Sequence, residues 1–439
     1  MTRLQHFGWF FSRGFGPQGW GHPYREWNHD WTKPALYQQS VRELEQAGLD
    51  LVIMEDALSL GSPETLDLRV RGAYGGPKHD PLMLTPYLFA ATSRIGIAPT
   101  INAGAYPPYL AARQFATLAH LSDDRFGLNL VTDTGSARHF GLPALGHDAA
   151  YDRADEWMAV VRRLWHSWGE EALVADPSTG RFADGAALDA FRHQGEYFDV
   201  AGPLNAVPFE RGDPVVVSPG GSARGLAFAG TQSDVLLALA PLDAGSVRDY
   251  RARILGAATE RGRTASDIRV LFVVKPEIVP SREEAVRVVE ASRHPSDDVL
   301  RAIALGQSSD LETDLTTLDL DRPVDPAVFG EHVSHGSIKG LLGGAGSFAD
   351  ATLRELLTVK ARKGLVSERA GFVGTADEFT DFVEELGDDG GSDGMIFSGD
   401  LHPVTVHRML DELVPVLRRR GVLRQELGDG GLRGNLFDF

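Results

Sequence analysis

Several residue types and patterns that carry common functions are missing from this sequence. It contains no cysteine, which excludes disulfides, thiolate-held metals and cysteine nucleophiles. Basic residues are outnumbered by acidic ones, 43 to 61, and the resulting net charge of −18 at pH 7 argues against a nucleic-acid partner. No apolar run approaches the roughly 20 residues of a membrane span, and the N-terminus turns polar too early for a signal or transit peptide. We therefore expect a cytoplasmic protein.

The motifs of common hydrolases and metalloenzymes are absent as well. The sequence has no His-Glu-x-x-His, no Gly-x-Ser-x-Gly and no evident Ser-His-Asp arrangement. His332 and His335 lie three residues apart in a polar segment, where we expect them to be solvated. The sequence therefore predicts no metal site.

A run of β-branched residues ends in small residues at VVVSPGGSARG, residues 215–225. This junction has neither the Gly-Lys-Ser/Thr ending of a P-loop nor the Gly-x-Gly-x-x-Gly spacing of a dinucleotide site. Free backbone N–H groups and the positive end of a helix dipole would favour an anion there. An ordinary turn between a strand and a helix has a similar composition, so the residues alone leave both interpretations open.

The 439 residues, 43% of them apolar and 24% charged, are typical of a globular protein. Short apolar runs alternate with helical patterns such as 151–168 and 281–292. Repeated strand-helix units predict an α/β fold, a (β/α)8 TIM barrel, in a single domain over 1–439. A doubly wound sheet is the alternative, but its fingerprint is missing after the first strand. The predicted strands are 4–11, 49–56, 94–101, 125–132, 213–220, 234–240, 268–279 and 393–399.

Two stretches, at about 169–212 and 293–372, fall outside the repeat of strands and helices. The second is rich in Gly, Ser and Asp, with a helix expected near 349–363. Insertions in a barrel usually lie over the carboxyl ends of the strands and shape the site there. We expect both to act as lids.

The residues at the predicted strand ends point to the kind of chemistry. They offer aromatic rings, small hydroxyls and acids rather than metal ligands. This mixture suits a planar cofactor with polar edges, which performs the chemistry itself and needs positioning and dry surroundings from the protein. The candidates are Phe10, Phe11, Asp56, Thr100, Asn129, Asp133 and the segment 218–222.

Tyr151 opens the predicted helix 151–168, and His147 lies four residues before it. Together they could reach the same anion as Ser222. Spacing alone favours a simpler arrangement, in which Tyr151 packs in the core and His147 faces solvent.

Five stretches together resemble a known family: 94–133, 137–142, 147–168, 193–225 and the tail from 414. They are similar to flavin-dependent monooxygenases grouped with nitrilotriacetate, dibenzothiophene sulfone and long-chain alkane monooxygenases, in the bacterial-luciferase-like superfamily. The resemblance spans nearly the whole chain in order. It implies a luciferase-like TIM barrel with lid insertions.

The resemblance further implies a two-component enzyme that uses O2 and reduced FMN, supplied by a separate NAD(P)H:flavin reductase. One oxygen atom would pass from a flavin C4a-(hydro)peroxide to an apolar, aromatic or heteroaromatic small molecule, with or without sulfur or nitrogen. A homodimer or homotetramer is expected. By position, Asp56, Thr100 and Asn129 would lie at the flavin, His147 and Tyr151 near its ribityl phosphate, and Gly221 and Ser222 at the phosphate itself.

The expected catalytic residues are Phe10, Phe11 and Asp133. Phe10 and Phe11 would line a dry pocket, which Trp20, Trp27 or Trp31 either extend or cover as a packed lid. Asp133 stands where the family commonly has serine, and its carboxylate would act as a base or tune the site. The segment 218–220 also departs from the usual Gln-Ala-Gly, which puts contacts to the ring edge in doubt.

Two other functions stay open at this point. One is a flavin- or deazaflavin-dependent oxidoreductase of the same superfamily that transfers hydride. The other is a non-catalytic flavin-binding protein, which would have no need for the lid insertions.

Overall fold

Eight parallel strands close into a barrel in the order β1-β2-β3-β4-β9-β10-β11-β14. The predicted TIM barrel is thereby confirmed, and the doubly wound sheet is wrong because the sheet has no open edge. Its strands are β1 (His6–Phe11), β2 (Leu51–Met54), β3 (Gly96–Asn102), β4 (Gly127–Val131), β9 (Val215–Pro219), β10 (Val235–Ala238), β11 (Arg269–Val274) and β14 (Gly394–Gly399). This computed structural model describes residues 4–11, 30–60, 63, 66–71, 73, 76–132, 134–330, 333, 335–343, 346–363, 371–399 and 403–438.

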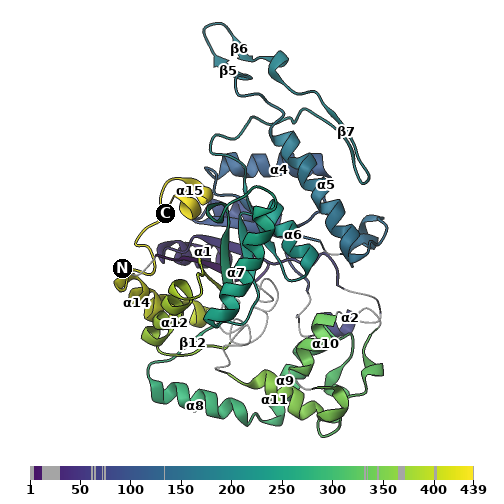
Figure 1. Cartoon of the computed structure of the whole chain (residues 1–439), viewed down its shortest axis with the longest axis vertical. Helices are drawn as coiled ribbons and strands as arrows, with labels where there is room; N and C mark the ends of the chain where they lie inside the picture. The colour runs from purple at the N-terminus through teal and green to yellow at the C-terminus, as the bar shows by residue number, and fades with distance from the viewer. Residues whose placement is uncertain are drawn as a thin grey trace.

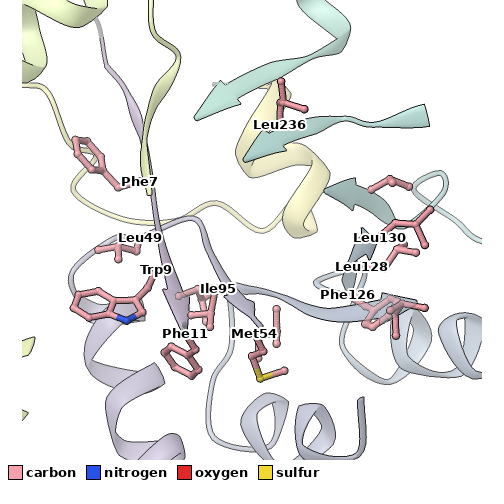
Figure 2. Close-up of a cluster of buried hydrophobic side chains, with 14 of the residues drawn as sticks. Phe7, Trp9, Phe11, Leu49, Met54, Ile95, Phe126, Leu128, Leu130 and Leu236 are labelled. Carbon is pink, nitrogen blue, oxygen red and sulfur yellow. The ribbon is translucent and has the colours of Figure 1, made fainter. Parts of the chain in front are cut away.

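Side chains alternate between the two faces of the barrel wall, as strand geometry requires. In β1, Phe7, Trp9 and Phe11 project to the helix side, where Figure 2 shows them among other buried apolar residues. Phe10 projects inward and packs against the interior cluster. Gly8 also faces inward, and a Cβ there would lie 2.6 Å from the Ile396 side chain, so the interior has no room for a larger residue.

Helices cover the outside of the barrel (Figure 1). The helix predicted at 151–168 buries Trp157, Val160, Val161 and Leu164, whereas Trp168 lies beyond its end. The covering helices are α1 (Ala35–Gln46), α3 (Pro81–Phe89), α4 (Pro108–Leu121), α5 (His147–Trp165), α6 (Ala223–Gln232), α7 (Ala244–Thr259), α12 (Ala376–Asp388), and α13 (Pro403–Arg408) continued by a π-helical turn (Met409–Leu413) and α14 (Val414–Arg419).

The C-terminal helix α15 (Gly431–Phe437) closes the amino end of the barrel. Leu432 and Leu436 of this helix belong to the interior cluster. Gly96, at the start of β3, makes room for Leu432, because a Cβ there would lie 2.3 Å from the leucine. A ligand at the barrel axis therefore has access from the carboxyl ends of the strands.

The insertion at 169–212 consists of two antiparallel hairpins and extends away from the barrel at the top of Figure 1. The first hairpin pairs β5 (Leu173–Asp176) with β6 (Arg181–Ala183), and the second pairs β7 (Arg192–Gln194) with β8 (Asp199–Ala201).

The second insertion forms a helical lobe with its own hydrophobic cluster, at the bottom of Figure 1. It contains α8 (Arg282–Arg293), α9 (Asp297–Ser308), α10 (His335–Leu342) and α11 (Leu353–Ala361), the last matching the helix expected near 349–363. The predicted helix 281–292 exists as α8, but it contacts α11 and β13 instead of covering the barrel. The lobe therefore starts before α8, and α12 takes the expected place on the barrel.

Short elements complete the chain. Strands β12 (Glu277–Ile278) and β13 (Val373–Gly374) pair at the base of the lobe, and the short helix α2 (Leu66–Val70) follows β2. No helix within the described residues is long and apolar enough to cross a bilayer. Single 3₁₀ turns span Ala137–Phe140, Gly185–Ala187, Ala265–Asp267, Leu315–Thr317, Pro326–Val328 and Phe348–Asp350.

Candidate functional site

Ser222, His147 and Tyr151 meet at the carboxyl end of the barrel. The Ser222 hydroxyl caps α6 by accepting the Gly225 N–H at 3.0 Å, and its oxygen lies 3.3 Å from His147 Nε2. The Tyr151 ring lies edge-on to the His147 ring with centroids 5.2 Å apart. We call these three side chains, with the backbone of 220–222, the anion cradle. The fold thus joins residues that are 75 positions apart in the chain.

Two helices begin at the anion cradle, α5 at His147 and α6 at Ala223. The first N–H groups of a helix lack partners within the helix and carry the positive end of its dipole. Gly221 leaves open space there, since a Cβ added to it would meet no heavy atom within 4 Å. Gly225 has the opposite role: a Cβ on it would lie 2.9 Å from the Tyr151 hydroxyl, so glycine lets that hydroxyl approach the helix start. This arrangement suits a phosphate or another tetrahedral anion.

The nearest arginine to the anion cradle is already paired. Arg224 donates to Asp152 at 2.8 Å and to Asp155 at 2.6 Å, and its guanidinium carbon lies 5.4 Å from the centre of the Tyr151 ring. His147 Nδ1 lies 2.6 Å from Asp148 Oδ1, which fixes the ring so that Nε2 faces Ser222. The cradle therefore offers hydroxyls, backbone N–H groups and an imidazole rather than an unpaired guanidinium.

Thr100 and Asn129 lie opposite each other on β3 and β4, inside the barrel. The Asn129 amide nitrogen donates to the Thr100 hydroxyl at 2.8 Å. Asn129 is only 3% exposed, and its amide oxygen accepts no hydrogen bond from the part of the chain that the structure describes. An unsatisfied buried acceptor costs about 1–3 kcal/mol, so this oxygen is a natural partner for a donor on a bound ligand.

Asp56 lies in an acidic group just after β2. The pKa of Asp56 is raised to about 6, mainly by burial; Lys78 opposes the rise, and nearby Glu55 and Asp80 add to it. Lys78 itself pairs with Glu55. Burial, with smaller contributions from Asp80 and Asp56, also raises the pKa of Tyr106 above its ordinary value. Asp56 can therefore gain or lose a proton near neutral pH at the mouth of the barrel.

Phe10 and Phe11, which were predicted to line one pocket, lie on opposite faces of β1. Phe10 is partly buried on the interior side, toward the mouth, whereas Phe11 is 1% exposed in the layer between strands and helices. Adjacent strand residues alternate in direction, so the pair cannot line one pocket. The Trp31 carbonyl accepts hydrogen bonds from Tyr37 and His79, which anchors this tryptophan beside α1. Trp20, Trp27, Asp133 and His332 lie outside the described residues.

A small pocket, about 370 Å³ when its opening to solvent is counted, is lined in part by Ala150 and Arg153 of α5. Asn102, Ser136 and Arg153 are polar members of its lining, and the Asn102 amide donates to the Ser136 hydroxyl at 3.2 Å. The Arg153 guanidinium lies 5.3 Å from the centre of the Phe198 ring in the first insertion. Asn102 stood at a predicted strand end, but no local pattern in the sequence distinguished Arg153 from other helical arginines.

An ion pair links the lobe to the segment after β2. Arg71 donates to Asp314 at 2.7 Å, joining a residue just beyond α2 to the lobe, and the side chain of Asp314 is mostly buried. Figure 1 shows α2 beside the lobe helices. Asp56 precedes α2 in the same connection, so the lobe contacts the loop that carries a candidate site residue.

Comparisons with known proteins identify the family to which this barrel belongs. Residues 6–393 match the family described as luciferase-like monooxygenase. The chain belongs to this family. It is 32% identical to the dibenzothiophene-sulfone monooxygenase of Rhodococcus erythropolis (strain XP), over 99% of this chain and 97% of that one. It is 29% identical to nitrilotriacetate monooxygenase component A of Aminobacter aminovorans, over 95% and 92% of the two chains.

A solved structure extends this likeness to the fold. The crystal structure of a riboflavin lyase with modified FMN and riboflavin matches with a TM-score of 0.80 at 26% identity, covering 100% of this chain and 96% of that chain. This luciferase-like monooxygenase is therefore an enzyme of the flavin-dependent monooxygenase type.

Proposed function

We propose that this luciferase-like monooxygenase binds reduced FMN and inserts one oxygen atom from O2 into an apolar or heteroaromatic small molecule that contains sulfur or nitrogen. The observation that carries the proposal is the anion cradle. There the starts of α5 and α6 bring Ser222, His147 and Tyr151 together at the mouth of a luciferase-like barrel. When bound, the flavin supplies the activation of O2. The protein's own residues bind it, orient it and keep water away.

The residues at the mouth fit FMN at both of its ends. The phosphate would be held by the Ser222 hydroxyl, the Tyr151 hydroxyl, His147 and the backbone N–H groups of 221–222. The Asn129 amide oxygen, which lacks a partner among the described residues, would accept a hydrogen bond from the ring. Thr100 orients Asn129 through their 2.8 Å hydrogen bond, and Asp56 would contribute an exchangeable proton beside the ring.

The reduced flavin would come from a separate NAD(P)H:flavin reductase. The nitrilotriacetate monooxygenase relative is named component A, which indicates a second component in that system. No dinucleotide fingerprint follows the first strand of the present chain. A dry mouth then protects the bound flavin from water, and Phe10, together with the lobe, would supply that shielding. A homodimer or homotetramer stays a prediction.

An anaerobic titration with reduced FMN tests the cradle directly. Ser222→Ala should weaken binding by about 1–3 kcal/mol, because it removes a hydrogen bond to a charged group. The same change also removes a helix cap. Ser281→Ala is the matched control, since Ser281 caps α8 by accepting the Glu284 N–H, far from the cradle in the lobe. Unchanged affinity in Ser222→Ala would overturn the phosphate assignment.

Rapid mixing of the reduced-FMN complex with oxygenated buffer tests the reaction. Delayed return of oxidised flavin, and incorporation of labelled oxygen into an aromatic sulfone, would support an oxygenase. Immediate return of oxidised flavin, with and without the sulfone present, would favour hydride transfer or flavin carriage instead.

Asp133 lies outside the described residues, and its catalytic role stays a proposal. Asp133→Ser should change the pH dependence of turnover, because it removes a titrating carboxylate next to β4. A pH profile identical to that of the wild type would remove Asp133 from the reaction.

A further inference from the structure

A second concave surface lies between the barrel and the lobe, where Figure 1 shows β12 near the lobe helices. It encloses about 1320 Å³, including its opening to solvent. One wall comes from the segment after β11, another from α9 and the end of α11, and a third from the helix after β14. We call it the basic groove, after Lys275, Lys360, Arg362, Lys363 and Arg408 in its lining.

The charge of the basic groove is opposite to that of the molecule. The chain carries a net charge of −18 and has 6 lysines, at positions 33, 78, 275, 339, 360 and 363. Three of these lysines line the groove. Half of the lysines of an acidic chain therefore line one groove, together with two arginines, and such a local excess of positive charge attracts anions.

Most of this positive charge has no acidic partner. Glu277 is the acid in the lining, and Lys363 donates to it at 2.6 Å. The side chains of Lys275, Lys360, Arg362 and Arg408 form no ion pair with any residue that the structure describes. Elsewhere in the lobe Arg354 binds both Asp297 and Asp321. Like charges held close together repel each other, and a bound anion would relieve that repulsion.

The floor of the basic groove is apolar and its shape is concave. Ile278 and Met409 are buried, and Ile303 and Val373 line the same surface. An enclosed surface with an apolar floor and a charged rim fits a small molecule better than a flat protein surface. Lys275 directly follows β11, so the groove opens at the carboxyl end of the barrel. It shares no lining residue with the anion cradle.

We propose that the basic groove binds a small organic anion that has an apolar body and at least two acidic groups. Carboxylate, sulfonate and phosphate groups share the required chemistry. Two sources are open, a free organic polyacid such as a polycarboxylate and a nucleotide. The proposal does not depend on the identity of the flavin.

Calorimetric titrations with citrate and with ADP, in the absence of flavin at low ionic strength, test this proposal. The groove variant is Lys275→Gln/Arg408→Gln, which removes two exposed charges from two walls. The matched control is Lys33→Gln/Arg42→Gln, which removes one lysine and one arginine at exposed positions around α1. The wild type and the control should bind at least one probe equally, and the groove variant should bind it at least tenfold more weakly.

The outcomes separate the sources and can overturn the proposal. Groove-dependent binding of citrate alone assigns a polycarboxylate, and groove-dependent binding of ADP alone assigns a nucleotide. Binding of both assigns the shared polyanion chemistry. The proposal fails if neither probe binds the wild type, or if both double variants lose binding equally. It also fails if the groove variant loses affinity for reduced FMN, because the groove would then belong to the flavin site.

Discussion

The anion cradle and the basic groove both attract negative charge at the same end of the barrel, but they are built in opposite ways. The cradle has hydroxyls, helix N–H groups and one imidazole, and its nearest arginine is held by two aspartates. The groove has an apolar floor and four cationic side chains that form no ion pair with the described part of the chain. The first arrangement is directional and fits one shape of anion, whereas the second acts through charge and accepts several.

This difference teaches where specificity comes from. Hydrogen-bond donors fixed by backbone geometry act over short distances and are screened little by salt. Exposed charges on long side chains act over longer distances and are screened strongly. The predictions below alter one region and measure the other as its reference.

The largest effect is expected from charge reversal in the groove. Lys275→Glu/Lys360→Glu should weaken citrate binding by about a hundredfold, because two attractive charges become repulsive. Affinity for reduced FMN should change less than about twofold, since the cradle shares no residue with the groove. Calorimetry measures the first quantity and anaerobic flavin titration the second. Parallel losses in both would show that the two regions are one site.

A smaller effect is expected from a methyl group inside the cradle. Gly225→Ala should weaken binding of reduced FMN about tenfold, because the new Cβ would lie 2.9 Å from the Tyr151 hydroxyl and displace it. Gly221→Ala is the matched control, since its Cβ would enter open space. Flavin titration of both variants makes the comparison, and equal affinities would argue that Tyr151 does not contact the flavin.

Salt should separate the two regions without any mutation. Raising NaCl from about 50 to 500 mM should weaken citrate binding about tenfold and flavin binding less than about threefold, because exposed charges are screened more than fixed donors. Titrations at several salt concentrations measure both slopes. A flavin slope as steep as the citrate slope would mean that unpaired charge also dominates the cradle.

The smallest effect concerns Asp56 and pH. Its folded pKa, about 6, lies above the ordinary value of 3.8, so between these values the native state binds a proton that the unfolded chain does not. The stability contributed by this proton is present at low pH and is lost as pH rises through 6. Asp56→Asn should therefore gain stability relative to the wild type as pH rises from about 4 to 8.

Thermal unfolding across this pH range measures the difference between Asp56→Asn and the wild type. Asp249→Asn, at an exposed position on α7, serves as the control and should follow the wild type. Parallel curves for Asp56→Asn and the wild type would show that burial does not perturb Asp56.

Sequence periodicity located all eight barrel strands, because alternating or continuous apolar runs record which face of a strand is buried. Periodicity also located α8, but it did not show which surface α8 packs against. An amphipathic helix has the same pattern whether it covers the barrel or belongs to the lobe. The prediction that Phe10 and Phe11 line one pocket was wrong for a different reason. Neighbours in a strand point to opposite faces, and the helix side of β1 is as apolar as the interior.

Local sequence by itself determined the elements of this luciferase-like monooxygenase and the residues at its strand ends. It identified Ser222 as part of a junction that could hold an anion and Tyr151 as the start of a helix, yet spacing alone favoured a buried tyrosine and a solvent-facing histidine. Only the tertiary structure decided that the starts of α5 and α6 meet, with His147 3.3 Å from Ser222. It alone gathered Lys275, Lys360 and Arg408 around one groove. The physical reason is that periodicity records burial within one element, whereas a site depends on contacts between elements far apart in the chain.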